Sequence, residues 1–161
     1  MTVYFELIDE LSDGVVEFYT VKLGDKETFE FEEFENNEFP NHQNEIEVLY
    51  SVLEEIKRRG PYERYFKFEG NASALPKVSE KIINANEHDF GIRLYCIKIG
   101  NDKVVLLNGG IKTKLNPQEC DNVRTHFNNA RNIARVLDKH IDEKEINITD
   151  LECLNFYTLE I

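Results

Sequence analysis

Apolar and polar residues alternate over the first 35 positions of the chain. Apolar side chains occupy every second or third position in residues 3–7, 16–21 and 29–31. Asp13-Gly14 and Gly24-Asp25 separate these runs, and both pairs are typical of tight turns. The pattern therefore predicts a three-stranded antiparallel meander at the N-terminus.

Two helices are predicted farther along by apolar residues spaced three and four apart. The first runs from about Asn44 to Arg59 and stops at Gly60-Pro61. The second follows Pro117 and carries one continuous apolar stripe from Val123 to Ile141. Before the first helix, residues 29–42 lose their period, which indicates a loop or a boundary.

The clearest strand pair lies between the two helices. Phe90–Ile99 and Lys103–Ile111 are β-rich apolar runs separated by Gly-Asn-Asp, so we expect a hairpin. Alternation along the first strand places Arg93, Tyr95 and Ile97 on one face. Weaker patterns predict the remaining segments: a short strand over 62–68, a loop over 70–76, an uncertain segment around 78–85 and a strand over 155–161 that adds to the N-terminal meander.

These elements predict an α+β fold in which helices pack on an antiparallel sheet. We divide the chain into an acidic N-terminal β-meander (residues 1–45), a central domain (46–141) and a C-terminal strand extension (142–161). No stretch approaches the roughly 20 apolar residues that cross a bilayer, and the N-terminus lacks the pattern of a signal peptide. We therefore expect a cytoplasmic protein without membrane association.

Charge is distributed unevenly along this acidic chain. The net charge is −12, but residues 1–50 alone carry fourteen acids against two lysines. Residues 51–140 carry sixteen basic and eleven acidic side chains, and residues 141–161 carry one lysine against six acids. A basic middle flanked by acidic ends permits an electropositive site. The acidic ends could cover that site, or they could mimic its anionic ligand.

Common cofactor and metal signatures do not occur in the sequence. The three cysteines are widely spaced with no CxxC pair, and the four histidines form no ligand spacing. Phosphate-binding, dinucleotide-binding and GxSxG patterns are also missing. The sequence therefore predicts no cofactor and no metal.

Residues 46–141 resemble the RelE/HigB-like toxins of type II toxin–antitoxin systems, in the RelE/ParE superfamily. The resemblance lies in the order of elements, in Arg93 within IRLYCI, and in the strand VVLLNGG that runs into Lys112-Thr113-Lys114. The adjacent lysine pair of the family is split here, and the first 45 residues have no obvious counterpart. The resemblance implies a RelE-like core and a toxin restrained by an antitoxin.

Toxins of this family typically bind the ribosome and cleave mRNA, with the 2′-hydroxyl attacking the neighbouring phosphate. That reaction needs a base, an acid and cations for the developing charge. By the resemblance, Arg93 and Lys112 are candidate catalytic cations, with Tyr95 beside them for stacking or proton transfer. Lys114, Arg124 and Arg131 are candidate RNA contacts.

Each of these residues also has an ordinary structural explanation, so two hypotheses stay open. Basic side chains on a helix are often only a solvated face, and tyrosine suits strands on its own account. The first hypothesis is a metal-independent endoribonuclease that needs no small-molecule cofactor and has an antitoxin, the ribosome and mRNA as partners. The second is a catalytically inactive toxin-like scaffold that binds a protein through its acidic N-terminal region.

Overall fold

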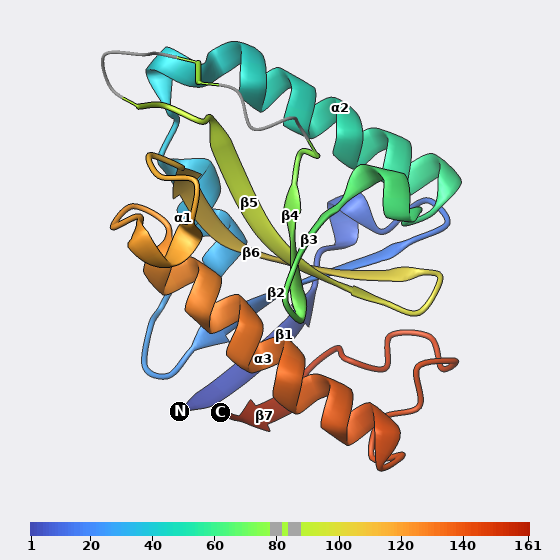
Figure 1. Ribbon diagram of the computed structural model, residues 1–161. Coiled ribbons are helices and arrows are strands. Elements are labelled where there is room, and N and C mark those ends of the chain that lie inside the picture. The colour runs from blue at the N-terminus through green and yellow to red at the C-terminus, as the bar shows by residue number, and fades with distance from the viewer. Residues whose placement is uncertain (78–81, 84–87) are drawn as a thin grey trace.

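The strands in the described part of the chain form one seven-stranded sheet in the order β3-β4-β5-β6-β2-β1-β7 (Figure 1). Our computed structural model describes residues 1–77, 82, 83 and 88–161. The strands are β1 (Thr2–Leu7), β2 (Glu17–Leu23), β3 (Lys67–Glu69), β4 (Ala72–Leu75), β5 (Ile92–Ile99), β6 (Lys103–Ile111) and β7 (Thr158–Glu160). Neighbouring strands pair antiparallel except β2 and β6, which run parallel.

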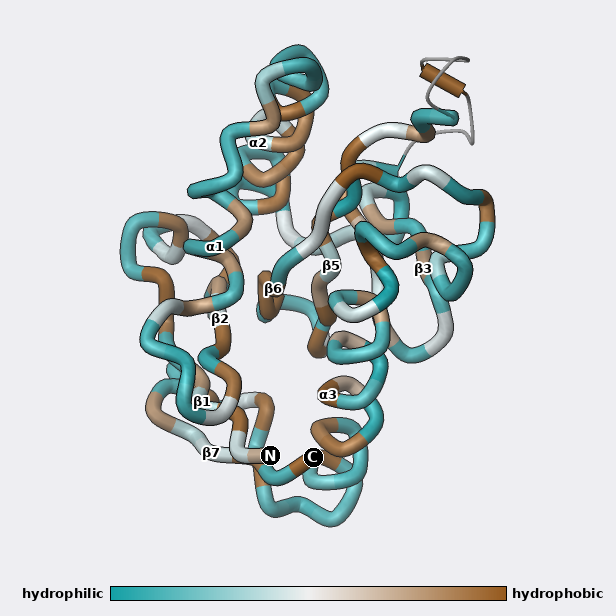
Figure 2. Tube along the Cα trace, turned by 90° about the vertical axis from the view of Figure 1, so that its left-hand side faces the viewer, coloured by the Kyte–Doolittle hydropathy of each residue, from teal (hydrophilic) through white to brown (hydrophobic). Residues whose placement is uncertain are grey.

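Helices cover both faces of this sheet. The described part of the chain contains the α-helices α1 (Glu30–Asn36), α2 (Gln43–Arg59) and α3 (Arg124–Asp142). It also has short 3-10 helices at Asp9–Leu11, Pro40–His42, Glu63–Tyr65 and Pro117–Glu119. One core lies between the sheet and α1 with α2, and a second lies between the sheet and α3. Figure 2 shows hydrophobic residues gathered on the strands and on the inner sides of the helices. The α+β fold is therefore as predicted.

The predicted helices and the central hairpin are confirmed. Helix α2 ends at Gly60, whose φ of 113° is left-handed and suits glycine, and the basic residues of its last turn face the negative end of the helix dipole. Helix α3 buries its predicted stripe, including Phe127, Ala130 and Leu137. Strands β5 and β6 pair antiparallel, with a register irregularity between Leu94 and Cys96.

The prediction of a third strand in the N-terminal meander is wrong, because residues 30–36 form helix α1. Phe31 and Phe34 are three residues apart and both buried, which is a helical spacing. The first turn carries several glutamates, which favour the positive end of a helix dipole. The hydroxyl oxygen of Thr20 on β2 accepts a hydrogen bond from the Phe31 amide at 3.1 Å. The predicted loop over 29–42 therefore contains a helix that packs on β2 and β6.

The predictions for residues 62–76 are also partly wrong. Residues 63–65 form a 3-10 turn, so the strand expected over 62–68 is only β3. The loop expected over 70–76 contains β4, which pairs with β5 and is entirely buried. The small residues of β4 carry little intrinsic β-propensity, and the pairing with β5 overrides that weak local signal. The uncertain segment around 78–85 lies outside the described residues except for 82 and 83.

The two ends of the chain meet at one edge of the sheet. Strand β7 pairs with β1 as predicted, and the N-terminal ammonium donates a hydrogen bond to the Ile161 carbonyl at 2.7 Å (Figure 1). Strand β1 pairs in turn with β2, and β2 lies beside β6. Strands from residues 1–45, 46–141 and 142–161 thus share one sheet.

Candidate active site

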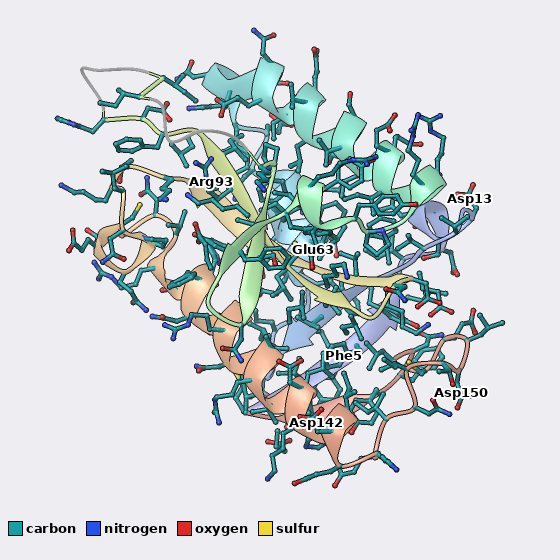
Figure 3. All side chains as sticks on the ribbon, turned by 45° about the vertical axis from the view of Figure 1, so that its right-hand side comes forward. Phe5, Asp13, Glu63, Arg93, Asp142 and Asp150 are labelled. Atoms are coloured by element: carbon teal, nitrogen blue, oxygen red, sulfur yellow. The ribbon has the colours of Figure 1, made fainter. Side chains whose placement is uncertain are left out.

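Arg93, Tyr95 and Lys112 lie on the face of the sheet that α3 covers. Arg93 and Tyr95 alternate with Leu94 on β5, and Tyr95 packs in the α3-side core. Lys112 follows β6 directly, and its amide donates a hydrogen bond to the Gly91 carbonyl at 2.8 Å. All three side chains are buried, with exposures of 0%, 0% and 1%. Figure 3 shows Arg93 near the start of β5, surrounded by other side chains.

Strand β3 adds two charged residues that the sequence analysis did not single out, Lys67 and Glu69. The Glu69 Oε1 atom lies 3.6 Å from Lys67 Nζ and 3.9 Å from Lys112 Nζ. The strand register explains why β3 residues lie near β5 residues, because Lys67 pairs with Ala74 and Ala74 pairs with Tyr95. A strand prediction extended by one residue would have placed Lys67 and Glu69 on one face by their spacing of two.

Small side chains make room for this cluster of Lys67, Glu69, Arg93, Tyr95 and Lys112, which we call the cation cluster. Strand β4 separates β3 from β5 and presents only Ala72 and Ala74 to the α3-side core. On β6, a Cβ atom built on Gly109 would lie 1.8 Å from the Arg93 carbonyl oxygen. Glycine at position 109 therefore allows the close approach of β5 and β6 beside Arg93.

Burial and mutual repulsion shift the pKa values of the cluster. Burial lowers the pKa of Lys112, the Arg93 charge lowers it further, and Glu69 only partly opposes this. Burial and the Lys112 charge likewise lower the pKa of Lys67. The pKa of Tyr95 is raised by burial and by Glu69, so the phenol stays protonated at neutral pH. Perturbed titratable groups gathered in one place are typical of functional sites.

Two buried oxygen atoms of the cluster have unused hydrogen-bonding capacity. Within the described part of the chain, neither Glu69 Oε2 nor the Tyr95 hydroxyl has a hydrogen-bond partner. The Glu69 side chain is 9% exposed and Tyr95 is fully buried. Leaving a buried polar group unpaired costs about 1–3 kcal/mol, so each such group needs an explanation.

Cys120 fastens the backbone on either side of Lys112. Its Sγ atom accepts a hydrogen bond from the Thr113 amide at 3.2 Å and lies 3.9 Å from the Ile111 carbonyl oxygen. The Asn122 side chain donates to the same Ile111 carbonyl at 3.2 Å. Burial acts to raise the pKa of Cys120, but hydrogen bonds from Thr113 outweigh it, and the net shift is downward.

A polar clamp fixes the start of β5 to α2. Glu45 of α2 accepts a hydrogen bond from the Ile92 amide at 2.9 Å. His42, just before α2, pairs with Asp89, which also accepts from the Gly91 amide at 2.8 Å. The backbone that carries Arg93 is thereby held from the opposite face of the sheet.

The predicted RNA contacts are dispersed. Arg131 of α3 stacks on Phe127 and reaches the β3–β4 turn, where a Cβ on Gly70 would lie 3.1 Å from its Nε. Arg124 binds the Gln118 carbonyl oxygen and the Asp121 carboxylate instead. Lys114 is exposed on the segment after Lys112. Of these three residues, Arg131 is the one that lies against the β3–β4 turn.

Two tyrosines lie on the segment just before β3. Tyr62 and Tyr65 flank the 3-10 turn before β3, and the Arg64 guanidinium stacks over both rings at 5.0 and 4.9 Å. Tyr65 also packs against the core between the sheet and α2. Tyr62 is 51% exposed, which also separates it from the buried cluster.

Comparisons of the chain with protein-family models, with curated proteins and with solved structures gave no match. Among the described residues, no group of three or more His, Cys, Asp and Glu side chains could hold a metal ion. The described helices include none with the length and apolar character needed to span a bilayer.

Proposed function

We propose that this chain is a RelE/HigB-type toxin that acts in the cytoplasm, cleaves mRNA at the ribosome and is neutralised by an antitoxin protein. The observation that carries the proposal is the convergence of Lys67, Arg93 and Lys112 on one face of the sheet. Arg93 and Lys112 are buried, and Lys67 lies beside them at the edge of the sheet with 28% of its side chain exposed. Their arrangement suits an anionic substrate.

The cluster contains the types of group that RNA cleavage requires. The RNA supplies the nucleophile, its own 2′-hydroxyl, and the protein must stabilise charge on the phosphate and move protons. Arg93 can contact two phosphate oxygens at once through its planar guanidinium. Lys112 and Lys67 add positive charge beside it. Arg131 on α3 extends the basic surface toward the β3–β4 turn.

RNA must be able to reach the cation cluster for this function. Arg93 and Lys112 are closed to solvent, whereas the Lys67 side chain on edge strand β3 is 28% exposed. RNA must therefore approach from the β3 edge, and the site must open further when RNA or the ribosome binds. The net charge of −12 opposes approach to a polyanion, so the basic middle of the chain must face the substrate.

Controlled expression in a bacterial host tests the proposal. We expect the wild-type chain to arrest growth and protein synthesis, and the Arg93→Ala/Lys112→Ala double variant to relieve the arrest. Lys103→Ala is the matched control, because Lys103 is also a fully buried lysine of the sheet but pairs with Glu17 outside the cluster.

The control separates loss of chemistry from loss of folding. Arrest by the wild type and by any soluble Lys103→Ala protein, without arrest by the double variant, would support the proposal. Arrest by all three proteins would show that the site is misplaced. Normal growth with soluble wild-type protein would contradict the proposed function.

A second function, protein binding through the acidic N-terminal region, is favoured by the surface around α1. Two hollows of about 440 and 340 Å³ flank α1, and the described residues that line them include no Lys or Arg. They combine aromatic residues with glutamates, including Phe34 and Phe39 with Glu35 and Glu38. This surface suits a basic partner segment. Replacing Glu32, Glu35 and Glu38 with glutamine should weaken such binding at low salt, as pull-down with a basic partner would measure.

A further inference from the structure

The orientation of Glu69 points to a role in proton transfer. One carboxylate oxygen, Oε1, lies 3.6 Å from Lys67 Nζ and 3.9 Å from Lys112 Nζ. The other, Oε2, is buried and has no hydrogen-bond partner among the described residues. An ionised carboxylate accepts hydrogen bonds through both oxygens, so Oε2 is open to a donor from outside the chain.

Two features of the surroundings indicate which kind of ligand could supply this donor. Arg93, Lys67 and Lys112 supply positive charge that would meet an anion beside Glu69. The Tyr95 hydroxyl is buried without a partner and can donate one hydrogen bond. The ligand should therefore carry both a hydroxyl group and an adjacent anionic group. An RNA 2′-hydroxyl next to its 3′-phosphate has this composition.

We propose that Glu69 is the general base of the RNA cleavage reaction, with Lys112 as the general acid. This inference rests on the proposed function. The Glu69 carboxylate accepts the proton of the 2′-hydroxyl, and the 2′-oxygen forms a bond to the adjacent phosphorus. The bond from phosphorus to the 5′-oxygen breaks, and that oxygen receives a proton from the Lys112 ammonium. The products are a 2′,3′-cyclic phosphate and a free 5′-hydroxyl.

The geometry of the pair also explains how the site is restored. After cleavage Glu69 carries a proton and Lys112 has lost one. The two side chains lie 3.9 Å apart, so one proton transfer between them returns both to the starting state. Arg93 and Tyr95 keep their protons throughout and stabilise charge on the phosphate by donating hydrogen bonds.

Glu69→Gln tests the assignment because it keeps the shape of the side chain and removes the base. We would measure cleavage of ribosome-bound mRNA by the purified full-length protein across a range of pH. Loss of a general base typically lowers the rate by about 100- to 10,000-fold. The variant should also lose the part of the pH–rate profile on which the wild-type rate falls with added acid. A purely structural role would not remove that pH dependence.

Glu17→Gln is the matched control, since Glu17 also pairs with a buried lysine, at 2.9 Å, but lies outside the cation cluster. Measured at a pH and temperature at which the variant is folded, its cleavage rate and pH profile should match the wild type. If Glu69→Gln does not fold, Glu69→Asp and Glu69→Asn provide the same comparison with a side chain that is one methylene shorter. The aspartate variant should retain cleavage that the asparagine variant lacks.

The outcomes separate this inference from the function on which it rests. Wild-type cleavage together with a Glu69→Gln rate within threefold of it, and an unchanged pH profile, would overturn the role of Glu69 and leave the toxin proposal standing. No cleavage by the wild type on programmed ribosomes would overturn both.

Discussion

At the scale of single residues, the protein handles buried lysines in two different ways. Lys103 is fully buried and its Nζ lies 2.9 Å from Glu17, whose other oxygen accepts from the Glu152 amide at 2.7 Å. That network is satisfied and fastens the C-terminal segment to the sheet. Lys112 instead lies among other cations and has its pKa lowered. The surroundings therefore shift the pKa values of the two buried lysines in opposite directions, upward for Lys103 and downward for Lys112.

The sequence could predict part of this site and not the rest. The hairpin pattern and the resemblance to RelE/HigB-like toxins both point to Arg93, Tyr95 and Lys112, which the structure places together. Glu69 and Lys67 were missed because β3 is a three-residue strand next to β4, whose small residues gave no strand signal. Their role depends on pairing between strands, which local patterns do not encode.

Replacement of Lys103 by methionine should destabilise the fold strongly. Removing one partner of a buried ion pair leaves the other charge uncompensated, which costs about 3–5 kcal/mol. Chemical denaturation measures the loss. Lys139→Met is the control, because that side chain is 68% exposed, and it should change the free energy of unfolding by less than about 0.5 kcal/mol. Equal effects of the two substitutions would contradict the account of Lys103.

The same pair predicts how stability depends on pH. Burial acts to raise the pKa of Glu17, but hydrogen bonds from Lys103, the Glu152 amide and Tyr19 outweigh it, so the pKa lies below its ordinary value of 4.5. A carboxyl group with a lowered folded-state pKa stabilises the fold above that ordinary value and loses the contribution as the pH falls through the folded-state pKa. The melting temperature should therefore drop less below pH 4.5 in Glu17→Gln than in the wild type. Parallel curves for the two proteins would argue against the pair.

At the scale of elements, the long periodic segments followed their sequence patterns, whereas several short segments, among them α1 and β4, did not. Helices α2 and α3 each have an apolar stripe over many turns, so pattern and packing agree. The two phenylalanines near residue 30 fitted either a strand or a helix. The buried position of Phe34 against β2 and β6 selected the helix. Tertiary packing decided the outcome where the local signal was short.

Gly109 on β6 lies where β5 and β6 approach closely beside Arg93, so a larger residue at this position should disturb the pairing of the two strands. Gly109→Ala would place a methyl group 1.8 Å from the Arg93 carbonyl oxygen, within the backbone pairing of β5 and β6. We expect a loss of about 1–3 kcal/mol or more in the free energy of unfolding. Gly110→Ala should cost less, because its nearest contact is 3.0 Å away, on the segment before α3. Denaturation of both variants tests this order, and a reversed order would contradict it.

At the scale of the whole molecule, the acidic N-terminal region cannot be removed cleanly. Strands β1 and β2 connect β7 to β6, and they bury Val3, Phe5, Phe18 and Tyr19. Masking of the cation cluster by the acidic end therefore cannot be tested by truncation. Charge-neutralising substitutions on the exposed face of α1 are the suitable test.

A chain that lacks residues 1–45 should lose its cooperative fold. The deletion removes β1, β2 and α1, exposes the side of β6 that pairs with β2 and strips apolar residues from both cores. Thermal melting followed by circular dichroism should show no sharp transition for the truncated protein. A melting curve as steep as that of the full chain would show instead that residues 46–161 fold independently.

The most direct test of the central claim is to map the ends of mRNA on programmed ribosomes after incubation with the purified protein. The account predicts new 5′-hydroxyl ends within the ribosome-covered part of the message. These ends should appear with the wild type and with folded Lys103→Ala protein, and should be missing with folded Arg93→Ala/Lys112→Ala protein. Intact mRNA with folded wild-type protein, or cleavage that persists in the double variant, would contradict it.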